Sequence, residues 1–436
     1  MSEYNKEVNN LSTSSKSVFK GMITLVVGSG LSRIIGIISI PLITRFYSPS
    51  DYGVLALYVS FVTIISPFFT MRYVQAIPLP KRDEIAINLF SLCVKLILIW
   101  SVITSLIFYL FSKTIFELFD ARAVSSYWWI IIVGSAGMAF YELLSLWSTR
   151  EKKFRAMSRS QVNQSLIGNI TKIILGALSF KPIGLILGQF LNQSSGVVSL
   201  YNENKNKIKE LKTKISIDRE IKVAFHFREF LYYRFPSHLL MIGSIQAPLL
   251  MSALLFNKNV TGQLNLAIMV LSMPAYMIGH AMARAFYSEI ASIGKGNLKK
   301  IQLLTFKLQR KLFIVSIPLV IAIASLSEFL FSLVFGKTWE DSGLYAAILS
   351  PYIMFQFTSS PLMEVINIVG KQYYFLILNL IRFIGLILIY QIMKFFSFND
   401  VIYVSVISAY LSFFYFSASL LVINTLKNEV GLIDEN

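Results

Sequence analysis

Residues 85–112 read IAINLFSLCVKLILIWSVITSLIFYLFS, an apolar run whose one charged residue is Lys95. A helix of about 20 mostly apolar residues is long enough to cross the hydrocarbon core of a bilayer. Similar runs recur along the chain, which is 55% hydrophobic and 14% charged, with a mean hydropathy of +0.63. Soluble domains carry about 25% charged residues. The sequence therefore predicts a protein that crosses a membrane many times.

The apolar runs predict an all-α polytopic membrane protein of about twelve transmembrane helices, in two six-helix bundles around a central cavity. We expect an N-terminal bundle over residues 1–205, a basic cytoplasmic linker over 206–229 and a C-terminal bundle over 230–436. The expected spans cover residues 20–46, 54–79, 85–112, 127–149, 157–180, 183–202, 230–256, 262–288, 309–335, 343–369, 373–396 and 401–426.

Two short segments suggest that the halves arose by duplication. Asp51–Leu57 reads DYGVLAL at the start of the expected second span, and Val260–Leu266 reads VTGQLNL at the start of the eighth. Because six spans separate them, both halves share one topology, which implies a parallel repeat about an axis along the membrane normal. A binding site between the halves would follow from that arrangement.

The distribution of basic residues predicts the orientation. With both termini in the cytoplasm, that side receives most of the 40 lysines and arginines, largely from residues 150–159, 205–228 and 295–311. Cytoplasmic loops carry such an excess. The net charge of +17 then reflects topology and attraction to anionic lipids, and we expect no nucleic-acid partner. The lone Cys93 excludes a disulfide framework and a thiolate metal cluster, and we expect no metal site.

Charged residues inside the apolar runs point to a function. A charge in hydrocarbon costs about 2.5–3.5 kcal/mol on insertion scales, so such residues survive where they face a water-filled cavity or a partner. Three acids lie at comparable depth, and they cannot neutralise all of the bases: Glu142, Glu328 and Glu364. The surplus predicts a cavity for an anionic cargo. The seven intramembrane bases are Arg33, Arg72, Lys95, Lys172, Arg234, Arg284 and Arg382.

Polar residues also fall on single helical faces, which lipid-facing surfaces would not show. Such a face can line a cavity or join neighbouring helices, and both interpretations stay open. The longest face, in the fifth expected span, consists of Gln161, Gln164, Ser165, Gly168, Asn169 and Lys172. A shorter one, in the tenth, consists of Gln356, Ser360 and Glu364.

Other intramembrane groups leave alternatives open as well. Arg234 and Arg284 lie near the cytoplasmic ends of their spans and could snorkel to the headgroups. Glu142 and Glu364 occupy matching spans of the two halves. Each could neutralise a buried base, such as Lys172 or Arg382, or bind the proton or sodium ion that drives transport. Packing or proton transfer are the two interpretations for His238 and His280.

Three motifs in the first quarter of the chain resemble a known family. Pro41–Gly53 reads PLITRFYSPSDYG, Met71–Pro80 reads MRYVQAIPLP, and Ala86–Phe90 reads AINLF. These segments resemble the polysaccharide-exporter family (Wzx-type O-antigen flippases) of the multidrug/oligosaccharidyl-lipid/polysaccharide exporter (MOP) superfamily. Members commonly carry an acid at the position of Val74, so this chain lacks one candidate coupling carboxylate.

The resemblance implies a transporter that is not an enzyme. It would move an undecaprenyl-pyrophosphate-linked oligosaccharide, such as an O-antigen or capsule repeat unit, from the cytoplasmic to the outer leaflet of a bacterial inner membrane by alternating access. Other glycan-assembly membrane proteins are further candidate partners. No cofactor is expected beyond a coupling proton or sodium ion, for which the candidate carriers are Glu142, Glu364, His238 and His280. The candidate substrate-binding residues are Arg33, Lys172, Arg284, Arg234, Arg382, Arg72, Lys95, Asn169 and Gln161.

Two other functions compete with this one. A multidrug or other small-molecule antiporter of the same superfamily would favour buried acids and aromatic residues if it carried organic cations, and the chain has the opposite charge balance. A membrane-embedded glycan polymerase would need a large outer loop with catalytic residues, and the expected outer loops are short. A scaffold without transport activity would leave the seven buried bases unexplained.

Overall fold

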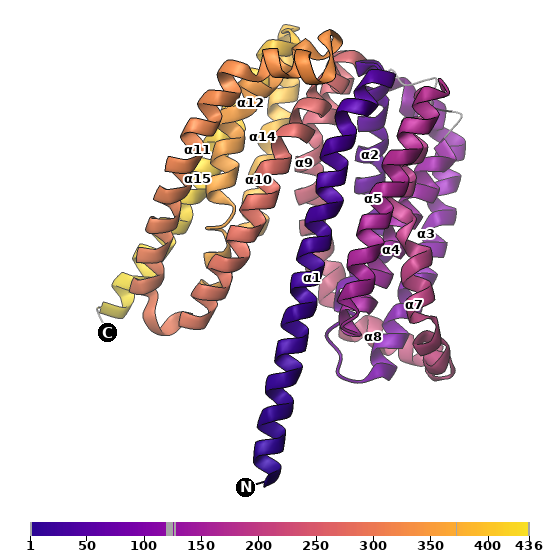
Figure 1. Ribbon diagram of the computed structural model, residues 1–436, viewed down its shortest axis with the longest axis vertical. Coiled ribbons are helices and arrows are strands. Elements are labelled where there is room, and N and C mark those ends of the chain that lie inside the picture. The colour runs from indigo at the N-terminus through magenta and orange to yellow at the C-terminus, as the bar shows by residue number, and fades with distance from the viewer. Residues whose placement is uncertain (1, 119–124, 126–127, 372, 435–436) are drawn as a thin grey trace. The chain divides into compact units, whose positions relative to one another are not determined.

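The computed structural model describes residues 2–118, 125, 128–371 and 373–434, and every regular element within these ranges is a helix (Figure 1). The side chains of residues 2–22, of parts of 274–296, of Asn367 and of 431–434 lie outside the described set. Eight of the described helices are long and apolar enough to cross a membrane. The prediction of an all-α, multi-pass membrane protein is confirmed.

The chain forms two compact units, and the first comprises residues 1–46 and 58–239. Within it, α5 contacts both α1 and α6, and α8 contacts the start of α3. Its elements are α1 (Ser2–Phe46), most of α2 (Pro49–Thr70), the short η1 (Tyr73–Ala76), α3 (Asp83–Leu118), α4 (Trp128–Arg150), α5 (Phe154–Ala177), α6 (Ile183–Ser194), α7 (Gly196–Leu211), η3 (Lys212–Lys214), α8 (Ile217–His226) and the π-helical turn η4 (Phe230–Arg234).

The second unit comprises residues 47–57 and 240–436. Apolar side chains of α10, α11, α13 and α15 form one buried cluster in it, which includes Ile290, Ile301, Val365 and Leu426. Its elements are most of α9 (Phe235–Leu255), α10 (Lys258–Ile293), η5 (Gly294–Asn297), α11 (Leu298–Phe335), η6 (Lys337–Trp339), α12 (Glu340–Ser359), α13 (Glu364–Val369), α14 (Tyr373–Phe396) and α15 (Asp400–Asp434).

All twelve expected spans fall on helices, but three of them are interrupted. The expected span 183–202 is divided at Ser195, between α6 and α7. The expected span 54–79 stops at Thr70, because Met71 and Arg72 adopt the left-handed conformation before η1 begins. The expected span 343–369 breaks between Ser359 and Glu364, where Pro361 cannot continue a helical hydrogen-bond ladder. The expected linker over 206–229 is largely helical, since α7 and α8 occupy most of it. The domain boundaries stay a prediction.

Local hydrogen bonds explain why the motif Tyr47–Gly53 contains Ser48, Pro49 and Asp51. The backbone N–H of Ser48 donates to the carboxylate of Asp51 at 2.8 Å, and the N–H of Asp51 donates back to the Ser48 hydroxyl at 3.3 Å. This reciprocal pair is a capping box, and Pro49 occupies the first helical position, where its missing N–H costs nothing. The motif therefore fixes the start of α2.

The two segments that match in sequence lie against each other in the second unit. A Cβ atom at Gly53 would come within 2.0 Å of the backbone oxygen of Lys258, and one at Gly262 within 1.7 Å of that of Pro49. Asn265 donates to the backbone oxygen of Tyr52 at 3.4 Å. Only glycine allows the starts of α2 and α10 to approach this closely.

Candidate functional site

The polar face of α5 joins this helix to its neighbours. The Ser29 hydroxyl on α1 donates to Gln161 Oε1 at 2.6 Å, and the Ser165 hydroxyl donates to the backbone oxygen of Ser32 at 2.7 Å. Asn169 donates its amide to the backbone oxygen of Ser165 at 2.9 Å. The bonds of Gln161 and Ser165 to α1 support the helix-joining interpretation for these two residues, whereas the Asn169 bond lies within α5. The roles of Gln161 and Asn169 in substrate binding stay predictions.

Lys172 ends this face in the contact between α5 and α6. Its side chain is buried, and its Nζ donates to Gln189 Oε1 at 2.7 Å. The lysine stem covers Gly188, where an added Cβ atom would lie 2.3 Å from Lys172 Cγ. Small residues at Gly168 and Gly188 bring the two backbones together. Lys172 is therefore held inside the first unit.

Arg72 and Glu142 form an ion pair in the first unit. Arg72 follows the end of α2 with a φ of 62°, and this backbone turn directs its side chain toward α4. Its Nη1 lies 3.0 Å from Glu142 Oε1, and the two side chains are 8% and 31% exposed. The base that Glu142 neutralises is thus Arg72, rather than Lys172 or Arg382.

Lys95 is also paired. Its Nζ donates to Glu220 Oε2 at 2.5 Å, where Glu220 belongs to α8 and is 5% exposed. Lys95 itself is half-exposed. Sequence reasoning missed this partner, because Glu220 lies in a basic segment that we expected to be a solvated linker.

The remaining candidates of the first unit lie on other elements. Arg234 is exposed in the π-helical turn, with its guanidinium 5.6 Å from the ring centroid of Phe230. His238 is half-buried near the start of α9, within electrostatic reach of Arg72. Arg33 is half-buried on α1. The functional roles of these three residues stay predictions.

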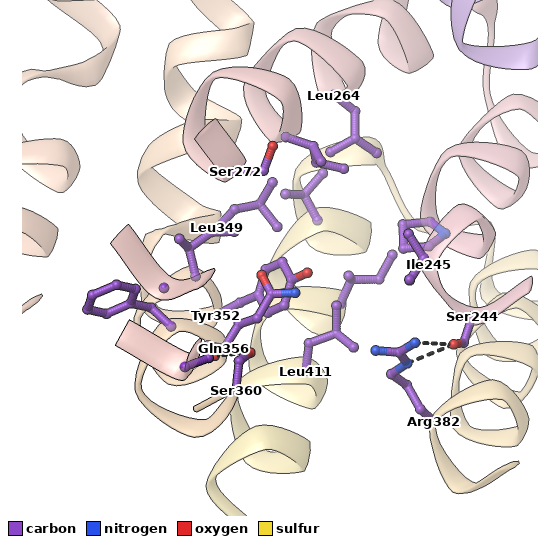
Figure 2. A pocket seen from close by; sticks show the side chains of 18 of the residues that line it. Ser244, Ile245, Leu264, Ser272, Leu349, Tyr352, Gln356, Ser360, Arg382 and Leu411 are labelled. Carbon is purple, nitrogen blue, oxygen red and sulfur yellow. Dashed lines mark hydrogen bonds between the residues drawn. The ribbon is translucent and has the colours of Figure 1, made fainter. Parts of the chain in front are cut away.

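Arg382 on α14 reaches a cavity of about 430 Å³ inside the second unit (Figure 2). Its Nε donates to the Ser244 hydroxyl at 2.8 Å, its Nη1 to the Tyr415 hydroxyl at 2.9 Å and its Nη2 to the backbone oxygen of Met241 at 3.2 Å. The guanidinium also lies 5.9 Å from the ring centroid of Phe414. These neutral oxygens orient the guanidinium without cancelling its charge.

The polar face predicted in the tenth span lines the same cavity. Figure 2 shows Tyr352, Gln356 and Ser360 across the cavity from Arg382, and Glu364 contributes from the start of α13. Gln356 donates to the hydroxyl of Tyr415 at 3.2 Å, which links this face to the partner of Arg382. Aliphatic side chains complete the lining, among them Leu264, Leu349 and Leu411.

The structure thus divides the intramembrane charges between two units. Arg33, Arg72, Lys95, Lys172 and Arg234 belong to the first unit, and Arg284 and Arg382 to the second. Arg72, Lys95, Lys172 and Arg382 each have a partner within their own unit. Arg284 and His280 lie on α10, with side chains outside the described set. A single chamber shared by all seven bases stays a prediction.

Several known proteins share features with this chain. A family model described as "Polysaccharide biosynthesis protein" matches residues 42–343. An inward-facing multidrug resistance MATE family transporter of the MOP superfamily is similar in structure, with a TM-score of 0.72 and 14% identity over 95% of this chain and 99% of that one. The lipid II flippase MurJ, inward closed, gives a TM-score of 0.68 and 15% identity over 94% of this chain and 87% of that one.

A Vibrio cholerae MATE transporter is also similar, with a TM-score of 0.58 and 12% identity over 96% of this chain and 97% of that one. No curated protein matches the sequence. At these identities, the three solved structures establish a common fold, which covers nearly the whole chain.

Proposed function

Because the chain belongs to the polysaccharide biosynthesis protein family and has the fold of MOP-superfamily transporters, we propose that it is a lipid-linked glycan flippase. Its cargo would be an oligosaccharide, such as an O-antigen or capsule repeat unit, on undecaprenyl pyrophosphate. The protein would move this glycan from the cytoplasmic to the outer leaflet of a bacterial inner membrane, with both of its own termini in the cytoplasm.

The observation that carries this proposal is the buried charge of Arg382, whose hydrogen-bond partners in a cavity of a membrane protein are neutral. Its hydrogen bonds go to two hydroxyls and a carbonyl, so its positive field remains available to an anion. The planar fork of arginine suits phosphate oxygens, because it forms paired, charge-assisted hydrogen bonds. Moving a pyrophosphate through lipid without such a partner would be costly.

The polar groups opposite Arg382 suit the sugar part of this cargo. Gln356, Ser360 and Tyr352 provide donors and acceptors for hydroxyl groups, and Glu364 lines the same cavity. Glu364 and Glu142 remain our candidates for a coupling proton or sodium ion, together with His238 and His280. In alternating access, the cavity would receive the headgroup while the polyprenyl chain stays in lipid.

A second candidate, a multidrug antiporter, is favoured by the similarity to the MATE transporter. An organic cation would be repelled by the charge of Arg382. The two functions therefore make opposite predictions for removal of this charge, because Arg382→Ala would impair glycan flipping but would favour binding of a cation.

The test is complementation of a strain deleted for this gene with Arg382→Ala. We expect surface glycan to fall and lipid-linked precursor to accumulate on the cytoplasmic side, with the protein still present in the membrane. Arg310→Ala is the matched control, because Arg310 is an exposed base on α11 and should support normal surface glycan. Normal glycan with Arg382→Ala would contradict the proposed role of this residue, and increased efflux of a cationic dye would favour the antiporter.

A further inference from the structure

The helix α8 is fastened to the first part of α3. The backbone N–H of Ser216 donates to Asn88 Oδ1 at 3.0 Å, and Asn88 Nδ2 donates to the backbone oxygen of Lys214 at 3.1 Å. One α-helical turn into α8, Glu220 pairs with Lys95. The position of α8 along α3 is therefore fixed between Asn88 and Lys95.

The exposed apolar side chains of α3 indicate which part of this helix would contact lipid. Between the two lysines of this helix, exposed large apolar side chains run from Leu98, three residues after Lys95, to Phe111, two residues before Lys113, and beyond Lys113 only Leu118 is of this kind among the described residues of α3. Before this band, Asn88 and Cys93 are fully buried. A helix rises 1.5 Å per residue, so Lys95 and Lys113 lie about 27 Å apart, close to the thickness of a hydrocarbon core. Lys95, and with it α8, lies at one edge of this core.

Three different faces of α8 have three different environments. Glu220 and Val223 are buried on the face toward the rest of the first unit. Ile217, Ile221 and Phe225 recur at steps of four along a second face, and they are 67%, 51% and 68% exposed. The third face is polar and includes Lys222 and the other exposed residues Asp218, Arg219 and His226. A helix lying at a membrane surface needs this division between an apolar and a charged face.

The residues around α8 favour an anionic membrane surface. Exposed Lys212, Lys222 and Arg228 bring positive charge, whereas Lys214 and Arg219 share Glu84 at 3.3 and 3.9 Å. Asp218 and Glu229 are the exposed acids of this segment. Tyr232 and Tyr233 follow with 65% and 74% exposure, and tyrosine is enriched at membrane–water interfaces. Basic residues beside an apolar face attract anionic headgroups.

We propose that α8 is a membrane-interface helix, with the face formed by Ile217, Ile221 and Phe225 inserted among the lipids of the leaflet where α3 begins. Lys222 and Arg228 contact anionic headgroups of that leaflet. This surface anchors the segment that connects α7 to α9, independently of which cargo the protein carries. Lys95 then serves to hold α8 at the edge of the hydrocarbon rather than to bind cargo.

The single cysteine makes this proposal testable by site-directed labelling. In a full-length Cys93→Ser background, an environment-sensitive fluorophore is attached at Ile221→Cys or Phe225→Cys, and the protein is reconstituted in vesicles containing brominated lipids. We expect lipid bromines to quench both labels nearly as well as a reference label at Leu106→Cys, which lies in the exposed band of α3. A label at Asp218→Cys should be quenched by aqueous iodide instead.

The outcomes are distinct. If the labels at 221 and 225 respond to iodide as the label at 218 does, α8 lies in water and the proposal is wrong. If they are shielded from both quenchers, another protein surface covers this face, and the proposal is also wrong.

A second measurement tests the charge of the lipid. Brominated phosphatidylglycerol should quench the label at 225 more strongly than brominated phosphatidylcholine at equal content. Lys222→Gln combined with Arg228→Gln should remove that preference while leaving the total quenching by lipid intact. Equal quenching by both lipids in the unsubstituted helix would overturn the assignment of anionic headgroups.

Discussion

In the first unit, Arg72 and Lys95 each lie within 3.0 Å of a carboxylate, whereas Arg382 in the second unit is held by hydroxyl and carbonyl oxygens. All three bases looked alike in the sequence, as single charges in apolar runs. The comparison separates two uses of a base in a membrane protein. A base paired with an acid fastens segments together, and a base held by neutral groups can still attract an anion.

The largest effect is expected from breaking the pair in the first unit. Glu142→Gln would leave Arg72 buried without its carboxylate, and we expect a loss of about 2–3 kcal/mol in stability, below the value for fully buried pairs because Glu142 is 31% exposed. Thermal unfolding in detergent measures this loss of stability. The double variant Arg72→Met with Glu142→Leu should recover part of the loss. If Glu142→Gln keeps full stability but stops transport, Glu142 acts in ion coupling instead.

A smaller effect is expected from substituting Arg382 in the second unit. Arg382→Lys keeps the charge but loses the planar fork, so we expect the rate of glycan flipping in vesicles to fall about tenfold, with a larger fall for Arg382→Gln. Arg310→Gln, on an exposed position of α11, serves as the control. If the lysine and glutamine variants have equally reduced rates, flipping depends on the planar guanidinium of Arg382 and not on its charge.

Lys172 allows a test between these two cases, because it donates to the neutral amide of Gln189 and also lies in a helix contact. Lys172→Met preserves the stem that covers Gly188 and removes the charge. We expect a change in stability within about 1 kcal/mol, since replacing a buried charge by an apolar residue of similar shape is often neutral. Glycan flipping in the same preparation shows whether the charge has a second role.

The smallest effect is expected from an ion pair at the surface. Lys207 lies 3.1 Å from Asp83, and this hydrogen bond raises the pKa of Lys207 above its usual value of 10.5. A base with a raised pKa in the folded protein stabilises it below the unfolded pKa, and this contribution is lost as the pH rises through the folded pKa. Unfolding measured between pH 9 and about 11.5 should therefore show a slightly shallower loss of stability for Lys207→Gln. An unchanged pH profile would mean that the pair contributes nothing.

Hydropathy predicted the helices well because bilayer-crossing segments must satisfy their backbone groups internally and be apolar over their length. It missed the interruptions after Thr70 and Ser359, since averaging over a window hides one left-handed turn or one proline. Hydropathy also could not predict which residues pair with the intramembrane bases. Glu220 lies far from Lys95 in the chain, and Ser244 and Tyr415 are ordinary residues in apolar runs until folding brings them to Arg382.

The close approach of Gly53 and Gly262 has a consequence for how the protein can be taken apart. Residues 47–57 belong to the second unit, although the chain on both sides of them belongs to the first. A cut within the 206–229 segment would therefore yield a C-terminal piece that lacks the helix start covering Gly262. We expect the C-terminal piece to need residues 47–57 in order to complete the second unit.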